Sequence, residues 1–361
     1  MTGRHLETAM VLAAGRGERM RPLTSALPKP ALPMPDGPVI ASAVRLAAAS
    51  GVGRVVVNVC HLAERMAEAV AELAINGVEI ACSFEDELMG SAGGLSLARD
   101  RGLLGEAGSV LVMNGDCNLG LDLAGFAEHH LESDNLVTLA LLPHLDPTRW
   151  SRVVLDAAGL VTEINPPGHP GPLEVPLLYP GVMAVHRNAL DALPSAPGEI
   201  PETLWSPARS QGRLGGLVVA GHWREVGTPA DYLEVMLNRL AGSAFIDPSA
   251  EVGRGASIEN AFVGRDAVIG DGAAVKDSVV AEGAEIGGGG THKLNDDPSG
   301  YGDHDVVEFE IVADGSRVVY LADLESDELF ELYSVPTDGG ESPVKLNGAL
   351  VADGDVLDFD I

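Results

Sequence analysis

Short apolar runs alternate with helix-like segments along residues 1–242. The runs that predict buried strands are 10–14, 54–59, 78–84, 109–113 and 137–142. Between them, apolar residues recur every three or four positions, the spacing of amphipathic helices, over 39–49, 62–73 and 123–132. This alternation predicts an α/β domain with a mostly parallel sheet covered by helices on both faces. Ligands of such sheets bind beyond the carboxyl ends of the strands.

From residue 244 the apolar residues repeat every five or six positions. They are Ile246, Val252, Ile258, Val263, Ile269, Val275, Val280 and Ile286, and a glycine follows four of them. This spacing is typical of a hexapeptide β-helix, in which each short strand adds one apolar residue to a continuous core. At three strands to a coil, the repeat is long enough for fewer than three coils. We therefore expect residues 243–290 to form a short β-helix.

Four glycines at 287–290 end the repeat, and a chemically different segment follows. Residues 291–361 contain 18 acidic and 3 basic residues, a net of −15 and half of the chain's −30. DVVEFEI and DVLDFDI occur in it fifty residues apart, with strand-like alternation between them. The segment resembles one blade of a TolB-type β-propeller, which cannot bury its own faces alone. We expect a small all-β tail that takes no part in catalysis.

The loop after the first predicted strand carries the most informative motif, LAAGRGERMRPLTSALPKP at 12–30. Gly15 and Gly17 let the backbone approach a polyphosphate and bond its oxygens. Arg19 and Lys29 can neutralise the charge that develops during phosphoryl or nucleotidyl transfer. The third glycine of a dinucleotide motif and the Gly-Lys pair of a P-loop are both absent. The loop therefore predicts a nucleoside triphosphate site.

A carboxylate follows the predicted strand at 109–113, in the turn Asn114-Gly115-Asp116. Parallel strands bring their carboxyl ends to one edge of a sheet, so we expect Asp116 to lie near the glycine loop. Mg²⁺ takes one or two carboxylates and completes its shell with phosphates and water. Asp116 is therefore a candidate metal ligand.

The string GRGERMRPLTSALPKP at 15–30 resembles the signature of the nucleotide-sugar pyrophosphorylases, also called sugar-1-phosphate nucleotidyltransferases. NGD at 114–116 and HWREVGTPADY at 222–232 are similar to two further motifs of that family. The resemblance extends to about residue 287. It implies a Rossmann-like fold of the nucleotide-diphospho-sugar transferase type, followed by a left-handed β-helix. It also implies a Mg²⁺-dependent reaction of an NTP with a sugar 1-phosphate, giving an NDP-sugar and pyrophosphate.

The resemblance implies a role for each matching residue. Arg19 is expected at the departing pyrophosphate and Lys29 at the α-phosphate, while Asp116 and Glu225 are expected to hold Mg²⁺. Gly227-Thr228-Pro229 is expected to cap a helix that begins near Ala230. The glycine loop and a small-residue segment after the strand at 78–84, whose backbone would read the base, are expected to bind the nucleotide. Those residues are Leu12, Ala13, Ala14, Gly15, Arg16, Gly17, Gly90, Ser91, Ala92 and Gly93.

Two positions depart from the family pattern. Glu225 stands where the family has Asp, offering the same oxygens on a stem one methylene longer. Residues 165–167 are Asn-Pro-Pro where the family has Glu-Lys-Pro, whose lysine contacts the sugar phosphate. Arg149 and Arg152 are weak candidates for the missing cation, and each could equally be a surface residue.

Composition narrows the class of protein further. A net charge of −30 argues against nucleic acid or an anionic membrane as a partner. The sequence has no apolar run of about 18 residues and no signal-peptide pattern. The three cysteines, Cys60, Cys82 and Cys117, do not suggest a disulfide framework, and the histidines show no zinc-site spacing. We expect a cytoplasmic protein.

Several functional subtypes stay open. The domain order favours a mannose-1-phosphate guanylyltransferase or a glucose-1-phosphate type, ahead of a uridylyltransferase acting on an amino-sugar phosphate. A non-catalytic, NDP-sugar-binding regulatory subunit would explain Glu225 and the missing lysine, although Arg19, Lys29 and Asp116 argue against it. A bifunctional enzyme with an acyltransferase β-helix is disfavoured because the coils are too few. The β-helix is a candidate contact for a homo-oligomer.

Overall fold

A computed structural model describes residues 6–73, 75–143, 146, 149–168, 177–287, 306–311, 317–322, 331–336 and 344–346. The chain divides into two compact units. The first comprises residues 1–250, 258–267 and 276–284, and the second comprises residues 251–257, 268–275 and 285–361.

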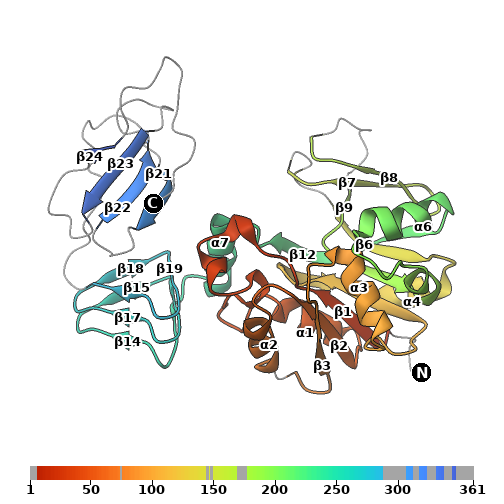
Figure 1. The fold of residues 1–361 in the computed structure, drawn as a ribbon, viewed down its shortest axis with the longest axis horizontal. Helices are drawn as coiled ribbons and strands as arrows, with labels where there is room; N and C mark the ends of the chain where they lie inside the picture. Colours follow the sequence, from red (N-terminus) through yellow and green to blue (C-terminus); the bar gives the residue numbers. More distant parts are fainter. Residues whose placement is uncertain are drawn as a thin grey trace, which may run out of the picture. The chain divides into compact units, whose positions relative to one another are not determined.

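The first unit is built on a ten-stranded sheet in which four neighbouring strands, beginning at one edge, are parallel (Figure 1). In spatial order the parallel strands are β3 (Glu79–Phe84), β2 (Arg54–Val59), β1 (Thr8–Leu12) and β4 (Ser109–Asn114). The mostly parallel sheet expected from the sequence is confirmed in this region. The first strand, however, ends at Leu12, so Ala13 and Ala14 belong to the glycine loop.

Mixed strands extend the sheet beyond β4. β10 (Val182–His186) pairs antiparallel with both β4 and β6 (Val137–Pro143). β11 (Leu214–Val218) pairs parallel with β6. The edge is completed by β9 (Leu177–Leu178) and the hairpin β7 (Arg152–Leu155) and β8 (Val161–Asn165).

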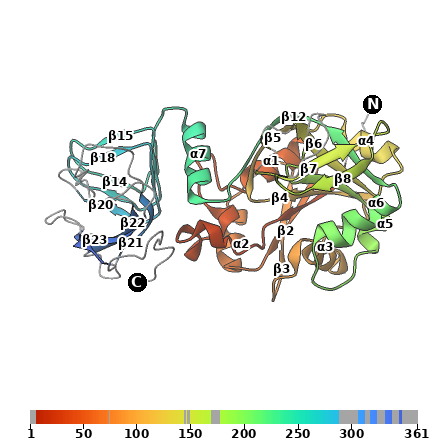
Figure 2. The ribbon, with the colours of Figure 1, turned by 90° about the horizontal axis from the view of Figure 1, so that it is seen from above.

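Helices cover both faces of the sheet, because successive strand residues point to opposite sides. Ala9 and Val11 of β1 pack in one cluster with α1 (Ala41–Ala49), α2 (Ala63–Ala71) and α4 (Phe126–Glu132). Met10 packs in a second cluster with α3 (Gly90–Asp100), α5 (Arg187–Asp191) and α6 (Ser206–Ser210) (Figure 2). A short π-helical segment, η4 (Pro201–Trp205), leads into α6.

A two-stranded antiparallel ribbon lies outside the large sheet and was not predicted. It pairs β5 (Cys117–Asp122) with β12 (Ala220–Glu225), bringing Glu225 opposite Cys117. α7 (Pro229–Leu240) follows, and Thr228 and Asp231 form a capping box at its start. The cap predicted at residues 227–229 is therefore confirmed in this form.

Three strands of the repeat region belong to the first unit. β13 (Phe245–Ile246), β16 (Phe262–Val263) and β19 (Val279–Val280) pair in parallel at a spacing of 17 residues. The rings of Phe245 and Phe262 stack with centroids 4.9 Å apart. Phe262 is buried in a third cluster with Met20 of the glycine loop and Tyr232 of α7.

The second unit contains a second parallel ladder and a separate antiparallel sheet. β14 (Glu251–Val252), β17 (Val268–Ile269) and β20 (Glu285–Ile286) pair in parallel. β15 (Ser257–Glu259) and β18 (Ala274–Lys276) form a further pair. The antiparallel sheet is made of β21 (Val306–Ile311), β22 (Arg317–Ala322), β23 (Glu331–Pro336) and β24 (Val344–Lys345). The sequence motif DVLDFDI at 355–361 lies outside the described residues.

Within the part of the chain that the structure describes, no helix combines the length and apolarity needed to cross a bilayer. Cys60, Cys82 and Cys117 are unpaired thiols.

One buried histidine predicts how the stability of the fold depends on pH. His130 of α4 lies 2.8 Å from Thr138 Oγ1 through Nδ1 and 3.1 Å from Ser109 Oγ through Nε2. Burial, together with the charges of His186 and His129, lowers the pKa of His130 to about 4. The unfolded chain therefore binds this proton more readily than the folded protein between pH 6.5 and 4.

We expect acidification across that range to reduce the free energy of unfolding by on the order of 3 kcal/mol through His130 alone. His130→Gln keeps hydrogen-bonding atoms but does not titrate, so its stability should fall less steeply over the same interval. Urea unfolding at pH 7, 5.5 and 4.5 measures both slopes. Equal slopes for the wild type and His130→Gln would contradict this assignment.

A shortened chain ending at Gly287 tests the passenger role expected for the tail. None of the catalytic candidates lies beyond that residue, so the shortened chain should retain full turnover. It should also be more soluble, because a lone four-stranded sheet exposes strand edges. Turnover and the highest soluble concentration are measured for both chains. Lost activity on shortening would show that the tail contributes to the site.

Candidate active site

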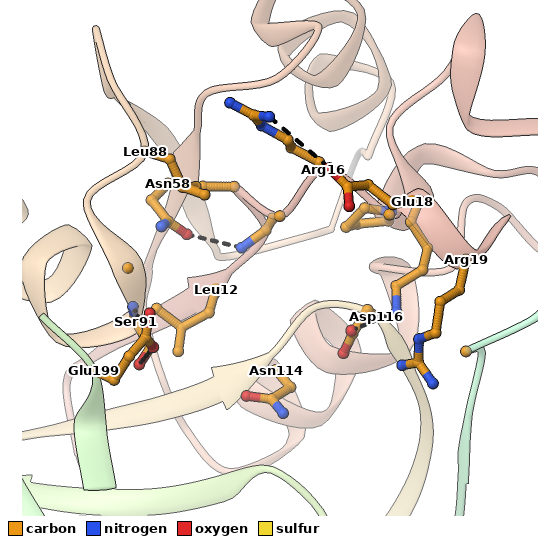
Figure 3. Close-up of a pocket in the computed structure, with 18 residues that line it drawn as sticks. Leu12, Arg16, Glu18, Arg19, Asn58, Leu88, Ser91, Asn114, Asp116 and Glu199 are labelled. Carbon is orange, nitrogen blue, oxygen red and sulfur yellow. Dashed lines mark hydrogen bonds and ion pairs between the residues drawn. The ribbon is translucent and has the colours of Figure 1, made fainter. Parts of the chain in front are cut away.

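A cavity of about 600 Å³ opens at the carboxyl ends of β1, β2 and β4. Because these strands run parallel and adjacent, the segments that follow them meet at one edge of the sheet. Figure 3 shows Ser91 and Glu199 on one side of the cavity and Arg19 and Asp116 on the other. The lining residues are Leu12, Ala13, Ala14, Gly15, Arg16, Gly17, Glu18, Arg19, Lys29, Pro30, Asn58, Leu88, Gly90, Ser91, Asn114, Asp116, Glu199 and Gly227.

The glycine loop is held in a folded shape by its own contacts. Gly17 has φ +64°, a conformation that favours glycine. Its carbonyl oxygen accepts hydrogen bonds from Thr24 Oγ1 at 2.8 Å and from Met20 N–H at 2.9 Å. A Cβ at Gly17 would lie 3.1 Å from Lys29 Cβ. The turn at Gly17 thus packs directly against the lysine segment.

Asn58, at the end of β2, anchors the start of the loop. It is 2% exposed, its Oδ1 accepts from Ala13 N–H at 2.8 Å, and its Nδ2 donates to Glu85 Oε1 at 2.7 Å. Glu85 Oε2 in turn accepts from Met89 N–H at 3.0 Å. This buried chain of hydrogen bonds joins the glycine loop to the start of α3.

Two ion pairs join the loop cations to the two predicted metal ligands. Lys29 Nζ lies 2.7 Å from Asp116 Oδ2, with side chains 11% and 30% exposed. Arg19 Nη2 lies 3.2 Å from Glu225 Oε1, and Arg19 is 68% exposed. Solvent screens the Arg19 pair strongly, so the Lys29 pair is the stronger of the two. Each of these two loop cations is therefore paired with one of the two carboxylates.

The two carboxylates lie at the same end of the β5–β12 ribbon, because Asp116 directly precedes β5 and Glu225 is the last residue of β12. Val226 N–H donates to Asp116 O at 3.2 Å, and Glu225 pairs with Cys117 in the β5–β12 ribbon. Burial, followed by the charge of Asp116, raises the pKa of the Cys117 thiol. The protonated thiol lies 3.3 Å from Asp116 Oδ1 and can donate to it. Among the residues described, no cluster of three or more His, Cys, Asp or Glu side chains could hold a metal by itself.

The small-residue segment at 90–93 forms the first turn of α3, and a second segment occupies its N–H groups. Ser91 N–H and Oγ donate to Glu199 Oε2, at 3.1 and 2.6 Å. Ala92 and Gly93 N–H donate to Gly198 O, at 2.9 and 3.1 Å. The N–H groups of Ser91, Ala92 and Gly93 are therefore not free to read a nucleobase.

The structure gathers most of the predicted residues but not all of them. Residues 12–17, Arg19, Lys29, Gly90, Ser91 and Asp116 line the cavity. Ala92 and Gly93 are buried in α3 and do not line the cavity. Glu225 does not line the cavity either, but it contacts Arg19, which does.

Neither of the two weak phosphate candidates lines this cavity. Arg149 lies over the ring of Trp150 and contacts Asp231 Oδ1 at 2.6 Å. Arg152 is 8% exposed, and its Nε and Nη2 have no hydrogen-bond partner. The cavity cations are therefore those of the glycine loop.

Sequence reasoning missed Asn58, Leu88 and Glu199 as parts of the site. Asn58 did leave a signal, because it is the one uncharged polar residue in the apolar strand RVVVNV. Leu88 is 45% exposed at the cavity, where a large apolar side chain can pack against a ligand. Glu199 reaches the cavity from a segment more than a hundred residues after Ser91, and no local pattern marks it.

The first comparison with known proteins decides the family. A sequence model described as "Nucleotidyl transferase" matches residues 8–242. The chain belongs to the nucleotidyl transferase family. The match spans the sheet, both clusters of helices and the whole candidate site of this nucleotidyl transferase.

Its relatives include named guanylyltransferases. The chain is 28% identical over 275 residues to "Probable mannose-1-phosphate guanylyltransferase 2" of Oryza sativa subsp. japonica, covering 69% of this chain and 74% of the relative. It is 28% identical over 273 residues to "Mannose-1-phosphate guanyltransferase" of Schizosaccharomyces pombe, covering 68% and 73%. The expectation of a nucleotidyltransferase that forms NDP-sugars is confirmed by these matches and by the family.

Solved structures show the same fold. HddC from Yersinia pseudotuberculosis superposes with a TM-score of 0.55 at 21% identity, covering 64% of this chain and 99% of that one. A putative glucose-1-phosphate thymidylyltransferase from Bacillus anthracis also gives 0.55 at 21%, covering 64% and 94%.

Substitution of Gly90 by alanine tests how closely α3 packs against the segment that contains Glu199. Gly90 has φ +72°, and an added Cβ would lie 2.6 Å from both Glu199 Oε1 and Gly198 O. Gly102 has a similar φ of +69° but open space around it. Gly102→Ala should therefore cost only the backbone strain, about 1 kcal/mol. Gly90→Ala should cost about 1–2 kcal/mol more, because the crowded atoms must also move.

Urea unfolding of the two variants gives this difference directly. Gly90→Ala should also weaken nucleotide binding, measured by calorimetry, whereas Gly102→Ala should not. Equal stabilities would mean that the contact with Glu199 is looser than the geometry indicates.

Proposed function

We propose that this chain condenses a nucleoside triphosphate with a sugar 1-phosphate in the 600 Å³ cavity, releasing pyrophosphate. The observation that carries the proposal is the pair of contacts Lys29–Asp116 and Arg19–Glu225 beside a glycine loop. A protein that only binds an NDP-sugar has little need for two cations and two carboxylates around the reacting phosphate. The arrangement therefore favours catalysis over the regulatory-subunit alternative.

The chemistry needs no nucleophile from the protein. An oxygen of the sugar phosphate attacks the α-phosphorus in line, and the bond from that phosphorus to the pyrophosphate oxygen breaks. Negative charge then grows on the pyrophosphate. Lys29 holds the α-phosphate, and Arg19 stabilises the leaving pyrophosphate. The backbone at Gly15 and Gly17 contacts the nucleotide phosphates.

Asp116 and Glu225 fit a divalent metal ion and would hold Mg²⁺. Both offer hard carboxylate oxygens, both lie at one end of the β5–β12 ribbon, and phosphates would supply the remaining ligands that Mg²⁺ prefers. When bound, the ion supplies positive charge that offsets charge developing on the phosphates. In the free protein Lys29 pairs with Asp116, and with Mg²⁺ held by Asp116 the lysine would be available to the substrate phosphate.

The names of the relatives favour guanylyl transfer to mannose 1-phosphate. We place the sugar in a second cavity of about 530 Å³, lined by Asn165, Pro166, Tyr179 and Trp223 among others. Asn165 and Pro166 occupy the positions where the family resemblance has its sugar-phosphate motif. Neither Arg149 nor Arg152 lines the first cavity. Lys29 is therefore the cation that would contact both the α-phosphate of the NTP and the phosphate of the sugar.

We further propose the remaining organisation on the sequence repeat and the strand pairing. Residues 1–242 form the catalytic domain, 243–290 a left-handed hexapeptide β-helix and 291–361 an all-β, blade-like tail. The parallel ladders at 17-residue spacing support the β-helix. The β-helix is the proposed contact for a homo-oligomer, and the cytoplasm is the proposed location.

Pyrophosphate release tests the proposal directly. Four NTPs crossed with a panel of sugar 1-phosphates, each with Mg²⁺, should give release with one clear pair. Silence across the panel, with tight binding of an NDP-sugar, would instead support the regulatory subunit.

Lys29→Ala should lower turnover by at least about 100-fold, because a preorganised charge at the reacting phosphate is removed. Lys276→Ala is the matched control, since Lys276 is exposed in the repeat region and pairs only with Glu259 at 3.6 Å. Initial rates of pyrophosphate release and thermal melting are measured for both variants. An unchanged rate for Lys29→Ala would remove Lys29 from the mechanism.

Two substitutions of Glu225 test separately whether the reaction needs a carboxylate at this position and whether it needs the longer side chain. Glu225→Asp keeps the carboxylate on the shorter stem of the family pattern and should stay within about tenfold of the wild-type rate. Glu225→Gln removes the charge and should lose about 100-fold or more. Mn²⁺ binding followed by electron paramagnetic resonance should weaken in Glu225→Gln. Full metal affinity in that variant would exclude Glu225 as a ligand.

A further inference from the structure

All three tryptophans of the chain line one cavity. Trp150, Trp205 and Trp223, together with Tyr179, surround the second cavity of about 530 Å³, although only 4% of the residues are aromatic. The four rings come from four places in the fold: Trp150 lies two residues before β7, Trp205 ends η4, Trp223 is in β12, and Tyr179 follows β9. All four side chains are half-buried, so each keeps ring surface outside the packed core.

The rings are fixed in pairs. Trp150 and Trp223 meet edge to face with centroids 4.9 Å apart, and Tyr179 and Trp205 meet in the same way at 4.9 Å. Trp205 Nε1 also lies 3.3 Å from Met183 Sδ, which orients the indole. Such pairs stabilise ring orientation beyond simple burial. The cavity therefore has preformed, rigid aromatic walls.

Few polar groups interrupt these walls. Among the residues that the structure describes, the cavity lining includes no Asp or Glu, and its one charged member is Arg209, which is exposed. Its other polar side chains are Ser151, Asn165 and Ser206, besides the tyrosine. A site that selects a fully hydroxylated ring needs a matching set of donors and acceptors, since each buried hydroxyl left unpaired costs binding free energy. This lining suits a ligand with an apolar part.

The cavity lies beside the candidate active site. Trp223 and Glu225 are two residues apart on β12, so their side chains share one face of the ribbon. Glu199 lines the first cavity and Pro201 lines the second. A glycosyl phosphate in the aromatic cavity can therefore present its phosphate toward Lys29 and Asp116.

We infer that Trp150 and Trp205 select a sugar 1-phosphate whose ring carries an apolar substituent, namely a deoxy carbon or an acyl group. The inference rests on the proposed function for the role of this cavity as the acceptor subsite. The indole faces pack against the C–H groups of the ring and its substituent. The hydroxylated parent sugar binds more weakly, because its extra hydroxyl replaces a group that the indole faces can pack against and must be desolvated there.

Tryptophan fluorescence reports on this cavity, because all three tryptophans of the chain line it, although Trp150 and Trp223 also line a third cavity of about 630 Å³. The wild-type protein, with a non-hydrolysable NTP present, is titrated with three ligands: mannose 1-phosphate, 6-deoxymannose 1-phosphate and N-acetylmannosamine 1-phosphate. At least one of the two substituted sugars should bind about tenfold more tightly than mannose 1-phosphate. Equal or tighter binding of mannose 1-phosphate would overturn the inference, as would the absence of any fluorescence change.

Two variants test whether the tryptophan side chains of the cavity cause the selectivity between sugar 1-phosphates. Trp150→Leu and Trp205→Leu should each reduce the ratio of the affinity for the preferred substituted sugar to the affinity for mannose 1-phosphate to about threefold or less. Calorimetry measures both affinities, and NTP affinity should stay unchanged. Phe84→Leu is the matched control, because Phe84 is an aromatic residue of β3 that is 48% exposed and lines neither cavity. An unchanged ratio in both tryptophan variants would overturn the assignment even if the wild type is selective.

Pyrophosphate release with the same ligands separates this inference from the proposed function. Selective binding without release supports the aromatic subsite and contradicts catalysis. Release that is fastest with mannose 1-phosphate, with no preference in binding, supports catalysis and contradicts the selectivity.

Discussion

The parallel pairing of β1 with β2 and β4 is the constraint on which the site depends. It carries the glycine loop, Asn58 and Asp116 to one edge of the sheet, although they are spread over about a hundred residues of sequence. Asn58 then fixes the start of the loop through Ala13 N–H, and Glu85 fixes Asn58. A shift of one residue in either pairing would turn these side chains to the opposite face. The sheet thus sets the geometry before any ligand arrives.

Charge is distributed in two opposing ways in this protein. The chain as a whole carries −30, a field that disfavours anionic substrates. Locally, Lys29 and Arg19 stand at the cavity, each beside a carboxylate. Those carboxylates hold the two cations at the cavity. Under the proposed function, this local arrangement lets a strongly acidic protein bind a triphosphate.

The two cavities differ in chemistry in the way that a two-substrate reaction requires. The first is lined by backbone, cations and carboxylates, which suit phosphates. The second is lined by aromatic rings and few polar groups, which suit the less polar face of a sugar. β12 contributes to both regions, with Glu225 beside Arg19 and Trp223 in the aromatic cavity. One antiparallel ribbon therefore positions groups for both substrates.

The sequence alone determined the strand and helix alternation, the glycine loop and Asp116, because these follow from local periodicity and contiguous motifs. It did not predict β5 pairing with β12, since the two strands are separated by almost a hundred residues and no local pattern tells which distant strand pairs with β5. It assigned base contacts to the backbone at 91–93, which the tertiary structure instead joins to Gly198 and Glu199. It also could not foresee that three distant tryptophans meet in one cavity. Motifs of neighbouring residues can be recognised in the sequence, whereas contacts between distant segments form only when the folded sheet brings those segments together.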